Sequence, residues 1–242
     1  FLALDTATLL IAGVYIGFSC DETAVMACIE QATMDKVAYC ARYGIEITPE
    51  QWPSAGMPSE IITDQGREFF GPRMSELCRR YGLEVLTLPP FRPDCKGAVE
   101  KTIDLLQQRY KPMLRGRGVI EDDAQERWAT DYRTQATLDL DDFARVVIHS
   151  VLYLNSGRLV DGKTPAERWT ELSPRLMAVD PQELYIQTLP RDTAKLTRKG
   201  LRINRMWYAP DDADGLTIGD SYSANFAPNY YHRPHSKTVI DN

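Results

Sequence analysis

One short segment of the chain begins as an apolar run and breaks at a Gln-Gly pair: Ile61-Ile62-Thr63-Asp64-Gln65-Gly66-Arg67-Glu68-Phe69. A short apolar run that ends at turn residues predicts a buried strand. Asp64 is therefore expected at the tip of that strand, with its carboxylate pointing out of the sheet into solvent. Ligands of open α/β sheets bind at such strand ends. The same pattern also occurs in plain turns, so Asp64 alone does not define a site.

A second carboxylate follows Asp64 after 35 intervening residues, at the end of Lys96-Gly97-Ala98-Val99-Glu100. From Thr102 to Leu114 apolar residues recur at roughly helical spacing, which predicts a helix with Glu100 on its first turn. A glutamate there can simply complement the helix dipole. As a pair, however, two hard oxygen ligands can hold Mg²⁺ or Mn²⁺. Two such ions can clamp the attacking and leaving oxygens of a phosphodiester exchange.

These motifs resemble those of the DDE transposases of the retroviral-integrase superfamily, and in particular the TnsB-type subunits of heteromeric cut-and-paste transposons. The resemblance rests on Thr-Asp-x-Gly-x-Glu-Phe at 63–69, on Lys-Gly-x-Val-Glu at 96–100, and on the segments 3–5, 11–18 and 89–94. It covers most of residues 1–115 and fades toward the C-terminus. It implies an α/β fold with an RNase H-like catalytic core.

The resemblance also implies a function. Asp64 and Glu100 match the second catalytic Asp and the catalytic Glu of the family, and they would be ligands of two Mg²⁺ or Mn²⁺ ions. The activity would be cleavage of DNA strands at transposon ends and their transfer into target DNA, without a covalent protein intermediate. The expected partners are transposon-end and target DNA, further copies of the chain assembled on that DNA, and accessory transposition proteins.

The first aspartate of the family's triad has no match in the chain. The family fold places three strands before its first helix, and the first of them carries that aspartate. Only two candidate strands, 2–5 and 9–18, precede the helical stretch that starts near Glu22. Asp5 therefore resembles an aspartate of the second family strand, and the first catalytic Asp is expected upstream of Phe1. On this interpretation residues 1–242 alone are inactive and lack the first strand of the core.

The formal net charge of −6 argues against a nucleic-acid enzyme, but its distribution does not. Binding to phosphates needs local positive charge. Residues 96–117 hold six basic and two acidic residues, and residues 191–205 hold six basic and one acidic residue. Although such runs are often only solvated faces, they indicate two places that meet DNA. The predicted DNA contacts are Lys96, which a hinge at Gly97 would direct to a phosphate, Arg92, Arg198 and Lys199.

Breaks in the pattern divide the chain into three parts. Residues 1–115 alternate strand-like and helical runs and form the predicted catalytic core, with helices at 22–44, 71–81 and 97–114. Residues 116–183 are a predicted helical connector, with a helix at 143–154 capped by an aspartate and another at 163–169 capped by Thr164. Residues 184–242 contain strand-like runs at 184–189, 195–197, 201–208 and 216–218, which predict a small β-barrel.

Composition favours a cytoplasmic protein, bacterial and associated with the nucleoid. No apolar run reaches membrane-spanning length and no signal peptide is recognisable. The five cysteines are odd in number without a C-x-x-C pair, which favours reduced thiols. Two alternative functions remain open. One is a different RNase H-like nuclease, and the other is a non-catalytic DNA-binding or assembly fragment.

Overall fold

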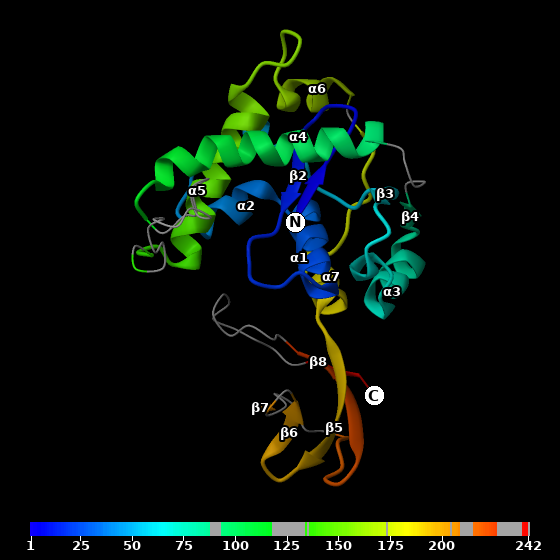
Figure 1. Ribbon diagram of the computed structural model, residues 1–242. Helices are drawn as coiled ribbons and strands as arrows, with labels where there is room; N and C mark the ends of the chain where they lie inside the picture. Colours follow the sequence, from blue (N-terminus) through cyan, green and yellow to red (C-terminus); the bar gives the residue numbers. More distant parts are fainter. Residues whose placement is uncertain are drawn as a thin grey trace.

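The computed structural model describes residues 1–87, 93–117, 134, 136–172, 174–203, 205–208, 215–226 and 239–241, with the backbone alone at 93–96 and 239–241. A helical body holds two short sheets, and a separate antiparallel sheet extends away from it (Figure 1). Among the described residues, no helix is both long enough and apolar enough to cross a membrane.

The elements follow one another along the chain, with labels as in Figure 1. The body comprises β1 (Leu2–Leu4), β2 (Ile11–Val14), α1 (Glu22–Thr33), α2 (Lys36–Ala41), β3 (Glu60–Thr63), α3 (Pro72–Tyr81), β4 (Glu84–Thr87), α4 (Pro93–Tyr110), α5 (Leu140–Leu152), α6 (Pro165–Leu172) and α7 (Pro181–Thr188). The extended sheet comprises β5 (Arg191–Thr197), β6 (Gly200–Ile203), β7 (Met206–Tyr208), β8 (Ser221–Asn225) and β9 (Val239–Asp241).

The body contains two separate two-stranded sheets. β1 pairs antiparallel with β2, and β3 pairs parallel with β4. Phe1 and Tyr15 exchange two backbone hydrogen bonds. In an antiparallel pair the next residue along the strand is not hydrogen-bonded to the partner strand, so the N–H and carbonyl of Leu2 point away from β2. The Glu84 N–H donates to the Ser59 carbonyl, which likewise turns the backbone groups of Ile62 away from β4. Within the described residues, β1 and β3 therefore each keep one open edge.

The outer edge of β2 is closed by side chains instead. Asn155 accepts a hydrogen bond from the Ile11 N–H at 2.9 Å and donates to the Ile11 carbonyl at 3.1 Å, as a neighbouring strand would. The Trp52 indole donates to the same carbonyl at 2.7 Å, and Gln31 accepts from the Val14 N–H. Asn155 lies in η5 (Tyr153–Gly157), a π-helical turn directly after α5. Residues outside the hairpin therefore pair the Ile11 N–H, the Ile11 carbonyl and the Val14 N–H of this edge.

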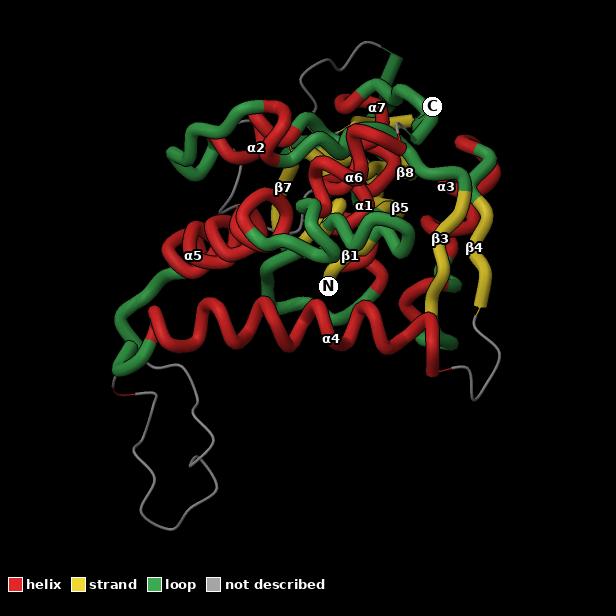
Figure 2. The backbone as a smooth tube through the Cα atoms, turned by 90° about the horizontal axis from the view of Figure 1, so that it is seen from above, coloured by secondary structure: helices red, strands yellow, loops and turns green. Residues whose placement is uncertain are grey.

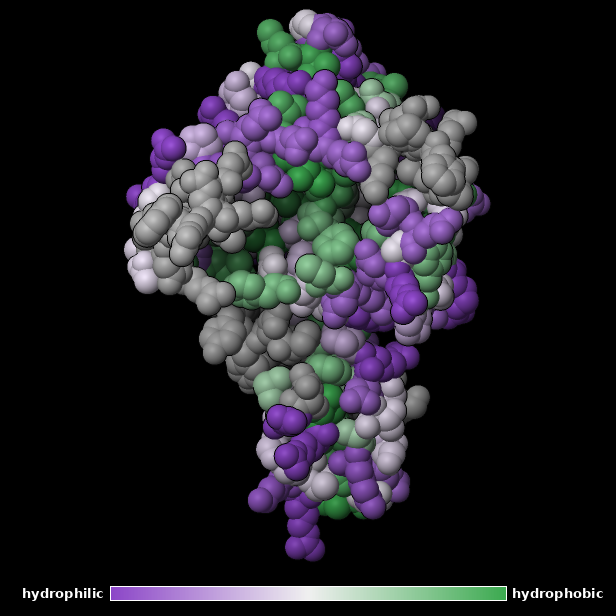
Figure 3. All heavy atoms as spheres, viewed as in Figure 1, coloured by the Kyte–Doolittle hydropathy of each residue, from purple (hydrophilic) through white to green (hydrophobic). Residues whose placement is uncertain are grey.

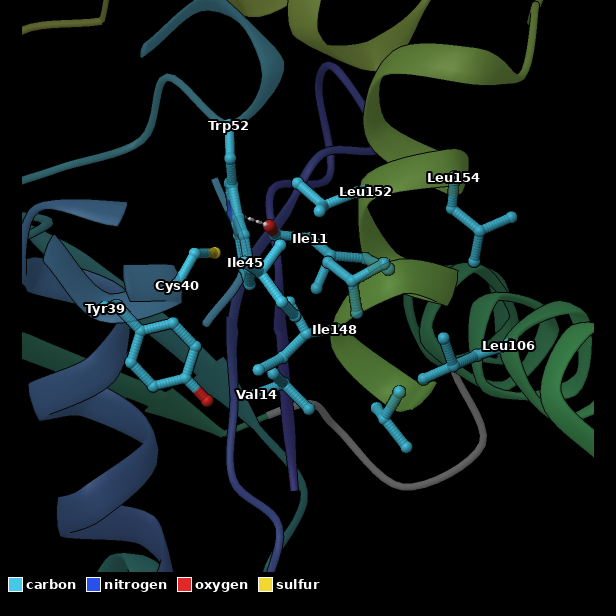
Figure 4. Close-up of a cluster of buried hydrophobic side chains, with 12 residues drawn as sticks. Ile11, Val14, Tyr39, Cys40, Ile45, Trp52, Leu106, Ile148, Leu152 and Leu154 are labelled. Carbon is cyan, nitrogen blue, oxygen red and sulfur yellow. Dashed lines mark hydrogen bonds between the residues drawn. The ribbon is translucent and has the colours of Figure 1, made fainter. Parts of the chain in front are cut away.

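The main core lies between β2, α2, α4 and α5. Figure 4 shows its side chains meeting across these elements, with Trp52 beside Ile11 and with Ile148 and Leu106 opposite. A second core cluster joins α1 and α3 to the β3–β4 pair and includes Leu184 of α7. The predicted connector helix α5 and Leu184 of α7 thus both pack into the body.

Local sequence signals explain several helix boundaries. Asp139 caps α5 by accepting a hydrogen bond from the Asp142 N–H, as predicted. Thr164 and Glu167 form a reciprocal capping box before α6. Gly82 ends α3 with a φ of 63°, the left-handed conformation that favours glycine. The predicted helix at 22–44 is instead two helices, because Asp35 caps α2 through the Ala38 N–H.

The C-terminal part corrects two predictions. Residues 184–188 form the end of helix α7 rather than a strand, since Asp180 caps the helix and Pro181 begins it. Residues 216–218 are not a strand either, whereas 221–225 form β8. The strands have the order β7-β6-β5-β8-β9 and form an open sheet, because among the described strands no pairing links β7 to β9. No closed barrel is therefore found.

An ion pair fixes α7 to the body. Glu22 accepts hydrogen bonds from the backbone N–H groups of Arg73 and Met74 and so caps α3. The Arg73 guanidinium pairs with Glu22 at 3.0 Å and donates to the carbonyl of Thr188, the last residue of α7, at 3.1 Å. Since β5 begins three residues later, this contact determines where the extended sheet leaves the body.

Candidate active site

Asp64 directly follows β3, as its sequence predicts. The register pairs Thr63 with Thr87, so β3 and β4 end together. The side chain of Thr63 is buried and that of Asp64 is exposed, which places the carboxylate beyond the sheet. One oxygen of the Asp64 carboxylate accepts the Gly66 N–H at 3.2 Å, and the Thr63 hydroxyl donates to the Asp64 carbonyl at 2.9 Å. These contacts orient Asp64 on a tight turn.

Another carboxylate lies beside this turn. A Cβ placed on Gly66 would come within 2.5 Å of Oε1 of Glu68, so the Glu68 side chain folds back over the glycine. Glu68 is the glutamate of the Thr-Asp-x-Gly-x-Glu-Phe motif, but it is not one of the metal ligands predicted from the sequence. The short spacing after a strand-end aspartate is the signal that could have singled it out. It adds negative charge next to Asp64.

Glu100 lies on α4, although not on its first turn. The helix begins at Pro93 and runs without interruption through Gly97, so Glu100 is about two turns inside it. The expectation of a hinge at Gly97 is therefore wrong. Proline is favoured at a helix start, and one interior glycine costs only about 1 kcal/mol. Lys96 and Glu100 are four residues apart, which places them on one face of the helix.

The fold brings the two predicted ligands to the same corner of the body. The carboxyl ends of β3 and β4 lie beside the amino-terminal end of α4 in both backbone views (Figures 1 and 2). Asp64 extends from the strand side, and Glu100 is exposed on the helix side. Both donate hard carboxylate oxygens, the donor set that suits Mg²⁺ or Mn²⁺. Within the described residues, however, no group of three His, Cys, Asp or Glu side chains could hold a metal ion.

Asp5 has a different environment from Asp64. One oxygen of its carboxylate accepts hydrogen bonds from the Thr8 backbone N–H at 2.8 Å and from the Thr8 hydroxyl at 2.5 Å. Its backbone N–H donates to the Leu10 carbonyl. These contacts tie Asp5 into the turn between β1 and β2. Such a role agrees with its interpretation as a residue of the hairpin and not as a metal ligand.

The structure describes only part of the predicted DNA contacts. Arg92 and the side chain of Lys96 fall outside the described residues. Arg198 and Lys199 are exposed on the tight turn between β5 and β6, where Gly200 has a φ of +103°. This turn and α4 lie at opposite ends of the molecule in Figure 1. Figure 3 shows the molecule from the same side as Figure 1, and in its upper part the residues along α4 are mostly hydrophilic.

Buried thiols supply no nucleophile to this corner. Burial raises the pKa of Cys28 to about 11 and that of Cys40 to about 11, so both remain neutral. The cysteines with described side chains are free, as predicted, and the side chain of Cys95 lies outside the described part. The chemistry that the described corner can offer is therefore that of carboxylates.

Comparisons with known proteins agree with the motifs. Residues 1–116 match the family described as the TnsB C-terminal domain. The transposition protein TnsB of transposon Tn7 from Escherichia coli is 27% identical over 227 residues, which is 86% of this chain and 32% of that protein. The chain thus spans about a third of the length of this relative.

Solved structures that match the chain include integrases. The catalytic core domain of BIV integrase covers 71% of this chain and 85% of its own length, at 18% identity and a TM-score of 0.43. The integrase assembly of simian T-cell lymphotropic virus, solved with a PP2A regulatory subunit, covers 99% of this chain and 68% of its own chain, at 13% identity and a TM-score of 0.45. Residues 1–116 thus match the TnsB C-terminal domain family, and most of the chain is similar in sequence to TnsB of transposon Tn7.

Proposed function

We propose that this chain is the catalytic part of a DNA transposase, which cleaves DNA strands at transposon ends and transfers them into target DNA. The observation that carries the proposal is the position of Asp64 at the end of β3 beside the amino-terminal part of α4, which presents Glu100. The two elements that carry these carboxylates are neighbours at this corner. This arrangement suits the exchange of phosphodiester bonds.

In this proposal Asp64 and Glu100 hold two Mg²⁺ or Mn²⁺ ions. When bound, the ions would activate a water or a DNA 3′-hydroxyl and stabilise the leaving oxygen. The Gly66 N–H and the Thr63 hydroxyl keep the turn of Asp64 in one conformation. Lys96 and Arg92 would hold a phosphate near this corner, and Lys96 shares the helix face of Glu100. No side chain needs to form a covalent bond to DNA.

The third carboxylate of the set would come from a segment that precedes Phe1. Two observations support this. The Asp5 carboxylate is engaged by Thr8, and within the described residues no group of three His, Cys, Asp or Glu side chains could hold a metal ion. In addition, β1 and β3 each keep an open edge, and one further strand between them would pair with both. An aspartate on that strand would end near Asp64.

In this proposal each of the three parts of the chain has its own role. Residues 1–115 supply the catalytic core, residues 116–183 the helical connector, and residues 184–242 a β-rich part that meets DNA separately through Arg198 and Lys199. Oligomers on DNA and accessory transposition proteins belong to the same proposal. A non-catalytic assembly role is the second candidate, because the described carboxylates alone do not complete a metal site.

The test is cleavage of transposon-end DNA in Mg²⁺ or Mn²⁺ by the protein that includes the preceding segment. Asp64→Asn and Glu100→Gln keep the shape of each side chain but lose the charge that holds the ions, so cleavage should fall by at least about 100-fold. Matched controls make the same change nearby. Glu60→Gln lies at the other end of β3, Asp104→Asn lies one turn after Glu100, and both residues are exposed.

The controls should keep cleavage within about twofold of the unmodified protein. DNA binding, measured without metal, should be nearly unchanged in all four variants. Cleavage that survives in Asp64→Asn or Glu100→Gln would contradict the catalytic assignment. An unmodified protein that binds the DNA tightly and never cleaves it would favour the assembly role.

A further inference from the structure

The outward face of the C-terminal sheet presents an aromatic side chain among cations. Along β5, β6 and β7 the buried positions are Ala194, Leu196, Leu201, Ile203 and Tyr208, which pack into one cluster with Ala224 and Phe226. Side chains alternate between the two faces of a strand. The alternate positions Lys195, Arg202 and Trp207 are exposed and share the opposite face.

Trp207 is 49% exposed although it lies within a strand. It stands directly opposite Arg202 in the β6–β7 register, and the guanidinium carbon of Arg202 lies 5.9 Å from the centre of the indole ring. Tryptophan contributes much apolar area and is enriched where proteins meet partners. The tight turns that flank this strand pair add the exposed residues Arg198, Lys199 and Arg205.

The charge of this face selects the partner. Residues 191–205 contain six basic residues and one acidic residue, in a chain with a formal net charge of −6. The acidic residue, Asp192, lies on the other side of β5 by alternation, and its carboxylate accepts the Thr193 N–H. On β8, Ser221 and Ser223 pair with Lys195 and Thr193 and carry no charge.

We propose that this face binds single-stranded DNA, with an unpaired base stacked on Trp207 and the neighbouring phosphates held by Arg202 and Lys195. Aromatic platforms within a basic surface are the common means of binding single strands, because every base offers a π-face. In a duplex those faces are covered by neighbouring bases. The occupant is therefore a single strand.

This binding is separate from the proposed catalysis. The sheet lies at the opposite end of the molecule from α4 in Figure 1, and stacking on an indole needs no metal ion. Binding is accordingly measured in the presence of a chelator, where cleavage cannot occur. Failure of the strand-cleavage proposal would leave this binding intact, and failure of this binding would leave cleavage untouched.

The experiment uses the 242-residue chain and two fluorescent DNA probes, an oligothymidine of about 12 nucleotides and a blunt duplex of the same length. Fluorescence anisotropy gives the affinity for each probe. Trp207→Ala should weaken binding of the single strand by about 5- to 150-fold, the range for loss of one stacked base. It should change duplex binding by less than about twofold. Trp207→Phe should recover most of the lost affinity.

Two further variants separate stacking from charge. Arg202→Gln should lower the slope of log affinity against log salt by about one unit, because one phosphate contact is lost. Phe18→Ala is the matched control. Phe18 is an aromatic residue of the body that is 91% exposed, and the residues before it in the sequence include no lysine or arginine. It should leave binding of both probes unchanged. Far-UV circular dichroism and thermal unfolding check that each variant keeps its fold.

The tryptophan emission supplies an independent readout. The oligothymidine should quench part of the emission of the unmodified chain, and that part should be missing in Trp207→Phe. Equal loss of single-strand and duplex affinity in Trp207→Ala would overturn the proposal, as would no loss at all. So would an unmodified chain that does not bind the single strand in the absence of metal.

Discussion

Lys36 is a buried cation whose removal should both destabilise the protein and change how its stability depends on pH. The side chain is 2% exposed. Its ammonium donates hydrogen bonds to the backbone carbonyls of Ala32 at 2.8 Å, Met34 at 2.8 Å and Ser54 at 2.9 Å. It therefore joins the end of α1, the start of α2 and the loop that follows Trp52. The perturbation is Lys36→Met, which keeps the length of the side chain but removes every donor.

The magnitude follows from two opposing effects. Hydrogen bonds from a charged donor contribute about 1.5–3 kcal/mol each, and three are lost. Against this, burial lowers the pKa of Lys36 from 10.5 to about 7, although the nearby Asp35 carboxylate opposes the shift. Since one pKa unit corresponds to about 1.4 kcal/mol, burying the charge costs up to about 5 kcal/mol. The difference leaves a net loss of about 2 kcal/mol near pH 7 for Lys36→Met.

The pH dependence has a definite sign. Between about pH 7 and 10.5 the unfolded chain holds a proton on Lys36 that the folded chain has released, so the unfolded state binds more protons. The free energy of unfolding then rises with pH in this window. Stability from Lys36 is fully present above pH 10.5 and is lost as pH falls toward 7. At pH 9 the unmodified protein should therefore exceed Lys36→Met by about 2–3 kcal/mol more than at pH 7.

Urea unfolding followed by circular dichroism at pH 6.5, 8 and 9 measures this difference. Lys101→Met is the control, since Lys101 is exposed on α4, and its effect should stay within about 0.5 kcal/mol at every pH. A difference between the unmodified protein and Lys36→Met that is independent of pH, or that shrinks as pH rises, would refute the reasoning. It would mean that the three carbonyls keep the pKa of Lys36 at or above its ordinary value.

Two substitutions test the hairpin of β1 and β2. Asn155→Leu should lower the free energy of unfolding by about 2–3 kcal/mol, because it leaves the buried Ile11 N–H without its acceptor while Trp52 still serves the Ile11 carbonyl; an unchanged urea midpoint would show that the amide does not pair this edge. Asp5→Asn should cost at most about 1 kcal/mol and leave metal-dependent cleavage by the extended protein within about threefold, since an amide oxygen can still accept the Thr8 donors. Complete loss of cleavage with an intact fold would make Asp5 a metal ligand after all.

The features that the sequence determined by itself are those with local causes. The apolar run before Asp64 ends at Gln65-Gly66, and β3 ends there as predicted. Asp139 and Thr164 cap the helices that follow them, and Gly82 ends α3. In each case a few neighbouring residues satisfy the backbone groups at a strand or helix end, so the pattern can be recognised without knowledge of the rest of the chain.

Only the tertiary structure decided the features whose partners are distant in sequence. Residues 184–189 are a strand-like run in the sequence, but α7 starts at Asp180 and Pro181, and burial of Leu184 against α1 and α3 and the contact of Arg73 with Thr188 hold 184–188 in that helix. Asn155 pairs with Ile11 across 144 positions of sequence, which no local pattern indicates. The open sheet depends likewise on strand pairing between β5 and β8. Packing and long-range hydrogen bonds outweigh intrinsic propensities of at most about 1 kcal/mol per residue, which is why these choices are visible only in the folded chain.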